Sequence, residues 1–378
     1  MKFSDIIGQQ SIKQRLINSV KNNRVSHAQL FYEQPGAGGL PLAVAYAQYL
    51  NCENKTDVDS CGICSSCLKI EKLVHPDLHF AVPTASDSKQ DKKALTTDYA
   101  VEWRKAFIDN PYLNLNDWFY ELGFETNKQL ILSADESADI IRKLSFKNFE
   151  AAYKVCIIWC PEKWNATSAN ALLKIIEEPP DKTVFILVTE NYDQLLPTIL
   201  SRTQLIKIPK VGIDELMQVL KTKHKVSDDD VKRIVHMSDG SYRAAMEFAE
   251  EENNDKYEVD FLNWMRLCLS PIKNYSGLNE WIEIMSKKKR EMIKNFIAFG
   301  LETCRECMLI NYADIAMVRF DEQQFPGLSK FAPFVNQNNA EEFSKQLSEA
   351  HYHIERNANA KILFLDLSFK VAKLLAVK

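Results

Sequence analysis

The sequence has 378 residues, of which 46% are hydrophobic and 26% charged, and its net charge is −4. This length exceeds one typical domain, so two or three domains are expected. The slightly acidic balance argues against a protein that holds DNA by phosphate neutralisation alone. We find no run of about 18 apolar residues and no apolar signal-peptide core near the N-terminus, so we expect a cytoplasmic protein without a membrane span.

The first predicted elements surround a glycine-rich loop. A helix is expected over residues 12–20 and a strand over residues 27–32 (HAQLFY), followed by EQPGAGGLPLA and a helix through residue 50. A strand, a glycine-rich loop and a helix in this order are typical of a P-loop, which binds nucleotide phosphates. The same order also fits a simple glycine-rich turn, so the loop residues decide what it can bind.

The loop lacks the residues that contact a nucleotide. A working P-loop reads G-x-x-x-x-G-K-[ST]; its lysine neutralises phosphates and its hydroxyl holds Mg²⁺. Aligned on Gly38, this chain has Glu33 at the first glycine, Gly39 at the lysine and Leu40 at the hydroxyl position. We predict that the loop keeps its backbone shape but binds ATP poorly and does not hydrolyse it, so no ATP is expected as a cofactor.

Four of the nine cysteines cluster within residues 52–67, in the pattern C-x8-C-x2-C-x2-C. Four thiolates satisfy tetrahedral zinc, and the two short C-x2-C steps can place sulfur atoms on one side of a tight turn. Free thiols and an iron–sulfur cluster are the alternatives. We predict a structural zinc site formed by Cys52, Cys61, Cys64 and Cys67.

A polar and aromatic segment at about residues 84–127 has no role that the sequence assigns. We expect its aromatic side chains to pack locally rather than to stack on bases, among them Trp103, Phe107 and Trp118. Residues 129–132 are expected to resume a strand. Ser133 and Glu136 have the spacing of a capping box, which predicts a helix after residue 133.

The most informative stretch is residues 153–204. Residues 153–159 and 183–188 are apolar runs rich in β-branched residues, which are typical of strands buried on both faces of a parallel sheet. Residues 168–178 between them have apolar residues at helical spacing, with Asn165 or Thr167 as the candidate cap. This order predicts a βαβ unit with its crossover helix.

Two motifs in this stretch carry a resemblance to a known family. ANALLKIIEEPP (residues 169–180) and SRTQ (residues 201–204) resemble the AAA+ clamp-loader subunits of DNA replication. In that family ANALLK-x-LEEPP follows the Walker B strand, and Ser-Arg-Cys follows the sensor 1 strand. The resemblance covers most of the first 250 residues and is weaker after them.

The resemblance implies an α/β AAA+ fold and three domains. We expect a core with a P-loop-like parallel sheet at residues 1–208, including a zinc module at 52–67 and the extra segment at 84–127. A three-helix lid is expected at 209–250 and an all-α collar at 251–378. FSDIIGQ near the N-terminus is similar to the family segment beside the adenine pocket, although it also fits an ordinary helix start.

The Walker B strand of the family ends in Asp-Glu, which order Mg²⁺ and activate water. This chain has Trp159 and Cys160 at those positions, and Glu162 lies shortly after them. Thr189 matches the polar sensor 1 residue, and Arg243 in GSYRAA matches the sensor 2 arginine. Because both Walker motifs are changed, we predict that the chain is not an ATPase on its own.

Arg202 matches the arginine of the Ser-Arg-Cys motif. The resemblance implies an arginine finger, which acts in trans on a neighbouring subunit by stabilising charge on the γ-phosphate. An ordinary surface or salt-bridged arginine is the alternative. We predict that Arg202 is the catalytic contribution of this chain.

Together these matches predict a non-hydrolysing stator subunit of the bacterial DNA polymerase III clamp loader. It would join gamma/tau motor subunits and a delta subunit in a hetero-pentamer, and would reach the sliding clamp and primer-template DNA through that complex. The alternatives are an ATP-hydrolysing motor subunit, which ATP binding by the isolated chain would support, and an independent zinc-containing DNA-binding protein. Salt-sensitive DNA binding by the chain alone would support the last.

Overall fold

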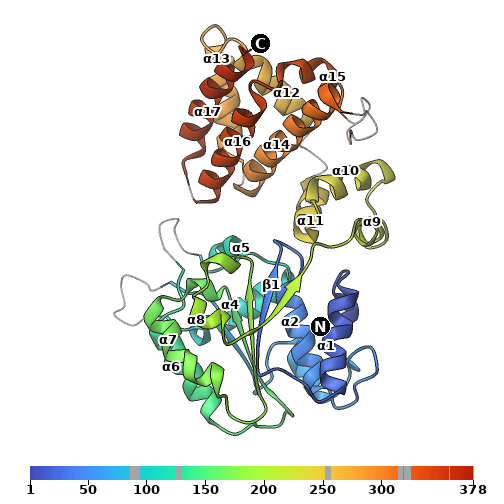
Figure 1. The fold of residues 1–378 in the computed structure, drawn as a ribbon, viewed down its shortest axis with the longest axis vertical. Helices are drawn as coiled ribbons and strands as arrows, with labels where there is room; N and C mark the ends of the chain where they lie inside the picture. The colour runs from blue at the N-terminus through green and yellow to red at the C-terminus, as the bar shows by residue number, and fades with distance from the viewer. Residues whose placement is uncertain are drawn as a thin grey trace. The chain divides into compact units, whose positions relative to one another are not determined.

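The structure is a computed structural model that describes residues 1–85, 94–123, 130–251, 257–288, 290–313, 318, 325–356 and 358–377. The chain forms two compact units (Figure 1). The first consists of Met1–Ser227 and Ser238–Glu247, and the second of Asp228–Met237 and Phe248–Lys378. A separate lid domain at 209–250 stays a prediction.

A five-stranded sheet organises the first unit, with the order β2-β3-β4-β1-β5 and all neighbours parallel. The strands are β1 Ala28–Glu33, β2 Leu78–Ala81, β3 Lys154–Trp159, β4 Thr183–Thr189 and β5 Gln204–Ile208. The predicted parallel α/β sheet is therefore confirmed. The strand predicted at 129–132 is wrong for its described part, because Ile131 and Leu132 make only isolated bridges with Thr84 and Trp164.

Alternate residues of the central strands face two different cores. Ile157 and Ile186 belong to the core that includes α2 (Gly39–Asn51), whereas Ile158 and Leu187 belong to the core beneath α6 (Ala134–Ser145) and α7 (Ala166–Glu177). Figure 1 shows α2 on one side of the sheet and α6 with α7 on the other. Burial on both faces explains why these strands read as continuous apolar runs.

Caps fix the starts of the helices on the second face. Asn165 caps α7, since its side-chain oxygen accepts a hydrogen bond from Ser168 N at 2.8 Å. Ser133 caps α6 by accepting from Glu136 N at 3.1 Å, but the predicted capping box is not completed. The Glu136 carboxyl instead accepts a hydrogen bond from Thr96 N at 2.7 Å, so it holds the preceding segment rather than its own helix.

The first unit contains further helices. They are α1 Gln10–Lys21, α3 Ser65–Glu71, α4 Ala100–Asp109, α5 Leu115–Glu121, α8 Pro197–Leu200, α9 Ile213–Thr222 and the start of α11 Tyr242–Glu251.

The second unit is helical. It contains most of α10 Asp228–Ser238 together with α12 Tyr257–Cys268, α13 Tyr275–Ser286, α14 Arg290–Tyr312, α15 Leu328–Phe331, α16 Ala340–Glu355 and α17 Ala360–Leu375. Aromatic side chains fill its core: Trp264 stacks on Trp281 at 5.4 Å and donates a hydrogen bond to Ser368 Oγ at 2.9 Å. Among the helices that the structure describes, none is long and apolar enough to cross a membrane.

Candidate functional site

The glycine-rich loop joins β1 to α2, and two of its backbone N–H groups donate hydrogen bonds to acceptors in the same segment. Ala37 N donates to Gln34 O at 3.0 Å, and Gly39 N donates to Glu33 Oε2 at 2.6 Å. The first N–H groups of a helix are the donors that bind phosphate in a P-loop. Because Gly39 opens α2, the Glu33 carboxyl occupies a donor that a phosphate oxygen would need.

Glu33 is enclosed by the protein, with only 6% of its surface exposed. Burial raises the pKa of its carboxyl to about 8, and the negative charge of Glu190 adds to the rise. Backbone hydrogen bonds from Gly38 and Gly39 and the positive charge of Arg243 act in the opposite direction. The side chain is therefore mostly a neutral carboxylic acid near pH 7, which avoids the cost of a buried charge.

The other residues predicted to stand at the Walker positions have buried side chains. Leu40 and Trp159 lie in the apolar core that includes α2, and Cys160 lies beside them with a φ of 54°. Burial raises the pKa of the Cys160 thiol well above its usual range. None of these three side chains offers an oxygen ligand for Mg²⁺.

The end of β4 lies beside a carboxylate that the sequence places after β3. Thr189, at the sensor 1 position, donates from Oγ1 to Glu162 Oε2 at 2.8 Å. The other oxygen of Glu162 accepts from Asn191 Nδ2 at 3.2 Å. Both oxygens of Glu162 thus have protein partners, and Thr189 is held by its own chain.

The four clustered cysteines converge in the structure. Their sulfur atoms all lie within 4.8 Å of one another, and Cys61 Sγ is 3.9 Å from Cys67 Sγ. A tetrahedral zinc with Zn–S bonds of about 2.3 Å requires sulfur atoms about 3.8 Å apart. Gly62, with a φ of 76°, provides the predicted turn. Backbone N–H groups of Ile63 and Cys64 lower the pKa of Cys61 to about 6, whereas burial raises the pKa of Cys52 and of Cys67.

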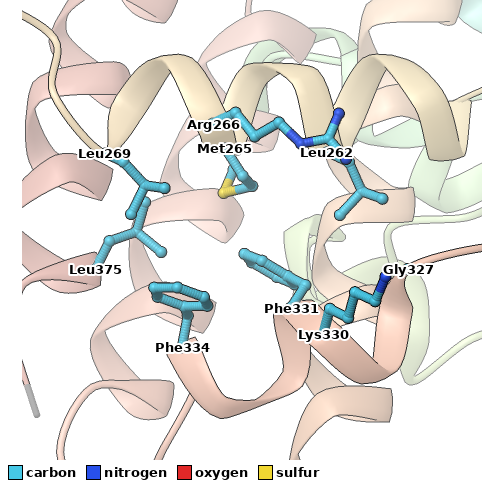
Figure 2. Close-up of a pocket in the computed structure, with 9 residues that line it drawn as sticks. All are labelled: Leu262, Met265, Arg266, Leu269, Gly327, Lys330, Phe331, Phe334 and Leu375. Atoms are coloured by element: carbon cyan, nitrogen blue, oxygen red, sulfur yellow. The ribbon is translucent and has the colours of Figure 1, made fainter.

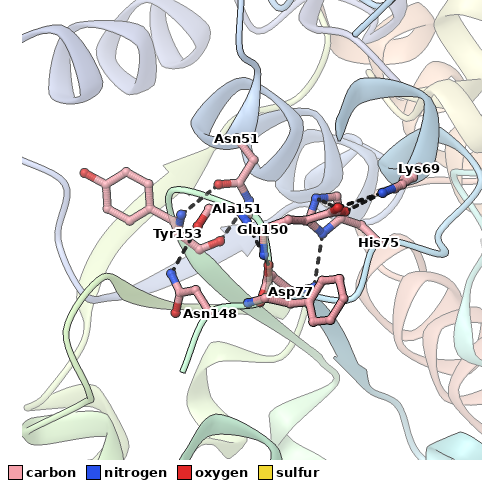
Figure 3. Close-up of polar contacts among 9 residues, drawn as sticks. Asn51, Lys69, His75, Asp77, Asn148, Glu150, Ala151 and Tyr153 are labelled. Atoms are coloured by element: carbon pink, nitrogen blue, oxygen red, sulfur yellow. Dashed lines mark hydrogen bonds and ion pairs between the residues drawn. The ribbon is translucent and has the colours of Figure 1, made fainter. Parts of the chain in front are cut away.

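A polar network anchors this cysteine module to the sheet (Figure 3). The Asp77 carboxylate, at the start of β2, accepts hydrogen bonds from the backbone N–H groups of residues 149–151 at 2.7 to 2.9 Å. Burial raises the pKa of Asp77, but these three donors outweigh it, so the pKa lies below its ordinary value. Lys69 on α3 pairs with Glu150 at 2.7 Å and so links the helix that carries Cys67 to the same loop.

Arg202 lies between α8 and β5, where its side chain is 31% exposed. Its Nε donates to Glu177 Oε2 at 2.8 Å, and its Nη1 donates to Thr198 O at 3.1 Å. The Glu177 carboxylate is itself 57% exposed, so this ion pair is worth at most about 1 kcal/mol. An anion from another molecule could displace Glu177 at little cost.

An apolar pocket of about 120 Å³ lies within the second unit (Figure 2). Its lining comes from α12, α15, the turn after α15 and the end of α17, and it consists of Leu262, Met265, Arg266, Leu269, Gly327, Lys330, Phe331, Phe334 and Leu375. The two cations are the charged members of this set. Without a carboxylate or a hydroxyl, the lining offers no group for metal-assisted phosphate chemistry.

One residue beside the glycine-rich loop was not identified from the sequence. Tyr112, in the turn between α4 and α5, lies against Gly38 and near Ile7. No spacing or motif marks this tyrosine, because its contacts are with segments that are distant in the chain. The aromatic residues predicted to pack locally do contact one another, since the Trp103 ring lies 6.3 Å from Phe107 and 5.3 Å from Trp118. They also enter the core that includes α2, where Trp103 and Trp118 are both buried.

The sequence matches a family model and several known proteins. The model described as DNA polymerase III, delta subunit, matches residues 8–212, more than half of the chain. The delta′ subunit of DNA polymerase III from Bacillus subtilis is 29% identical over 214 residues, which cover 56% of this chain and 51% of that protein. The gamma subunit from Buchnera aphidicola (subsp. Acyrthosiphon pisum) is 26% identical over 257 residues, which cover 67% and 59%.

The chain spans less than two thirds of the length of these relatives. Among solved structures, a DNA polymerase III gamma subunit-related protein from Thermotoga maritima aligns over 97% of this chain and 99% of its own, with 14% identity and a TM-score of 0.38. That score is too low to establish a shared fold. The match to the family model does not depend on it and covers the sheet, the cysteine module and Arg202. This chain therefore belongs to the DNA polymerase III delta and delta′ family of clamp-loader subunits.

Proposed function

We propose that this protein is a stator subunit of a DNA polymerase III clamp loader, which provides Arg202 to the nucleotide site of a neighbouring subunit and hydrolyses no ATP itself. One observation carries the proposal: the chain places its own Glu33 carboxyl on Gly39 N–H, whereas Arg202 is held by a partly exposed ion pair with Glu177 and by hydrogen bonds to Thr198 O and Ser201 Oγ. Its own glycine-rich loop is thus closed to phosphate, and Arg202 is available to the nucleotide site of a neighbouring subunit.

Membership of the family supports a proposal about the partners. We propose that the chain assembles with gamma/tau and delta subunits in a hetero-pentamer and contributes through that complex to loading the sliding clamp on primer-template DNA. Release from Glu177 would leave the Arg202 guanidinium free to form bonds with a γ-phosphate, where such a group stabilises the charge of the transition state. A motor role is disfavoured because Gly39, Leu40 and Trp159 supply neither a cation nor a Mg²⁺ ligand.

We also propose that Cys52, Cys61, Cys64 and Cys67 hold a structural zinc ion. The sulfur spacing fits a tetrahedral zinc, and four thiolates leave no open position for catalysis. The ion would fix the loop between α2 and α3, while the ion pair of Lys69 with Glu150 would transmit that order to the sheet.

The decisive experiment compares Arg202→Ala with Arg24→Ala, a change of an exposed arginine elsewhere in the first unit. Each variant is assembled with motor and delta subunits, and ATP hydrolysis is measured with and without primed DNA. We expect Arg202→Ala to preserve assembly and to slow hydrolysis at the adjoining motor site by about 10³-fold, the usual effect of losing a finger. Unchanged DNA-stimulated hydrolysis would rule out the finger.

The rival motor function is tested on the isolated chain. We expect a calorimetric titration of MgATP into the zinc-loaded protein to show no saturable heat up to millimolar nucleotide. Micromolar binding of MgATP would mean that phosphate displaces the Glu33 carboxyl from Gly39 N–H, and the stator proposal would be withdrawn.

A further inference from the structure

The described part of the extra segment, residues 94–123, packs against Trp159 and the glycine-rich loop. It is fixed to the sheet by Trp118, which is fully buried and donates from Nε1 to Pro83 O at 2.8 Å. The Trp103 ring, from α4, lies 5.3 Å from the Trp118 ring in an edge-on arrangement. This segment is therefore an integral part of the first unit and not a loop lying on its surface.

The first contact of the segment is with the Walker B position. Trp103 lies 5.4 Å from Trp159, the residue that stands where the family has its Mg²⁺-ordering aspartate. Trp103 is 2% exposed and Trp159 is 5% exposed, so the two rings bury each other. An aspartate at position 159 would place a carboxylate against this apolar surface, at a high desolvation cost.

The second contact is with the glycine-rich loop. A Cβ atom at Gly38 would lie 2.6 Å from Tyr112 Cε1, so the tyrosine ring rests directly on the backbone of the loop. Gly38 has a φ of 93°, which also favours glycine at this position. The Tyr112 hydroxyl accepts a hydrogen bond from Ile7 N at 3.1 Å, within the segment that resembles the border of an adenine pocket.

Tyr112 further contacts the start of α11. Its ring lies 4.6 Å from that of Tyr242 in an edge-on arrangement. The Tyr242 backbone N–H donates to Gly36 O at 3.1 Å, so α11 is also joined directly to the glycine-rich loop. One side chain thus links three segments that are distant in sequence: the N-terminal segment, the loop and the beginning of α11.

We propose that residues 94–123 form a built-in stopper, which here means a segment whose Tyr112 ring takes the structural place of a nucleotide. The Tyr112 ring holds the N-terminal segment, the glycine-rich loop and the start of α11 in one fixed arrangement. In a protein where a bound nucleotide bridged these three segments, the ligand would shift the population toward their ordered arrangement. Here the chain supplies the contacts itself, so the arrangement does not depend on ATP. This inference rests on the proposal that the pocket binds no ATP, but it does not rest on Arg202.

Hydrogen exchange on the full-length, zinc-loaded protein tests the stopper. The informative variant is Tyr112→Ala, and its matched control is Tyr120→Ala, because Tyr120 lies on α5 of the same segment but is 57% exposed. Losing the ring should raise exchange about tenfold in peptides from residues 5–9, 34–40 and 240–246, as expected from an aromatic pair together with its buried area. Peptides from β4 should keep the wild-type rate, and Tyr120→Ala should change none of them.

A second variant separates the hydroxyl from the ring. Tyr112→Phe keeps the packing on Gly38 and Tyr242 but loses the acceptor for Ile7 N–H, so only residues 5–9 should exchange faster. Unchanged exchange at all three segments in Tyr112→Ala would overturn the stopper. An equal rise that extends to β4 would also overturn it, since Tyr112 would then be an ordinary contributor to global stability.

The failure of this inference can be told apart from the failure of the proposed function. Wild-type protein is measured with and without millimolar MgATP, and the stopper predicts identical exchange. Protection of residues 34–40 by MgATP would contradict both the stopper and the nucleotide-free stator. A null result for Tyr112→Ala without any effect of MgATP would contradict the stopper alone.

Discussion

Replacing Glu33 with glutamine is expected to change how the stability of the first unit depends on pH. Burial and the charge of Glu190 raise the pKa of the folded carboxyl from 4.5 to about 8. The unfolded chain exposes this carboxyl to water, where it ionises near its ordinary value. Between these two values the folded protein holds one more proton than the unfolded chain. The stability gained from this extra proton is fully present below the pKa of the unfolded chain. It is lost as the pH rises towards the pKa of the folded carboxyl.

The magnitude follows from the linkage of one proton. Each pH unit in this window changes the wild-type free energy of unfolding by about 1.4 kcal/mol. From about pH 5.5 to about pH 7.5 the wild type should therefore lose roughly 2 to 3 kcal/mol that the glutamine variant keeps. Glutamine stays neutral at both values, and its side-chain oxygen can still accept the hydrogen bond from Gly39 N–H. Contributions from titrating groups that do not interact with Glu33 cancel in the comparison.

Urea unfolding at the two pH values measures this difference. Hydrogen exchange of peptides from β3 and β4 reports the first unit without interference from the helical unit. Glu178→Gln is the matched control, because Glu178 is an exposed carboxylate just after α7, and it should retain the wild-type pH dependence. If wild type and Glu33→Gln show parallel pH profiles, Glu33 is not a buried neutral acid and the account of the loop is wrong.

Two further predictions concern the cysteine module and its anchor. Elemental analysis should find about one zinc per chain in the wild type and none in Cys64→Ser, in which the loop between α2 and α3 should become sensitive to proteolysis. A loop that stays resistant to proteolysis after the metal is lost would contradict a structural zinc. Asp77→Ala should lower the free energy of unfolding by about 3 kcal/mol in urea titration, since three backbone donors lose their acceptor, whereas Asp77→Asn should cost less because one oxygen remains. Equal stability of Asp77→Ala and wild type would refute this.

The central part of the fold could be predicted because its sequence signals are local. The runs at β3 and β4 are apolar on both faces, and Asn165 caps the helix between them as its position suggested. The convergence of the four cysteine sulfur atoms could be predicted equally well, since their spacing in the sequence indicated it. In each case, residues close in the chain determine the geometry.

Contacts between distant segments could not be predicted in this way. The sequence places Glu33 at the first glycine position of the loop, but it does not show that the carboxyl turns onto Gly39 N–H and becomes neutral. Glu136 has the spacing of a capping box, yet its carboxyl binds Thr96 N because the folded extra segment brings that donor close. Tyr112 lies in a turn without any periodic pattern, so only the tertiary structure reveals its position on Gly38.

The changes in the glycine-rich loop depend on one another. A Cβ atom at Gly39 would lie 2.7 Å from Glu33 Oε1, so the inward Glu33 side chain requires the absence of a side chain at the position of the P-loop lysine. The side chain of a lysine at position 39 would therefore contact the Glu33 carboxyl before it could reach a phosphate. In the same way, Trp159 at the Walker B position requires an apolar partner, and Trp103 provides it. If the pocket is closed to nucleotide as we propose, recovery of nucleotide binding would require reversing both pairs together.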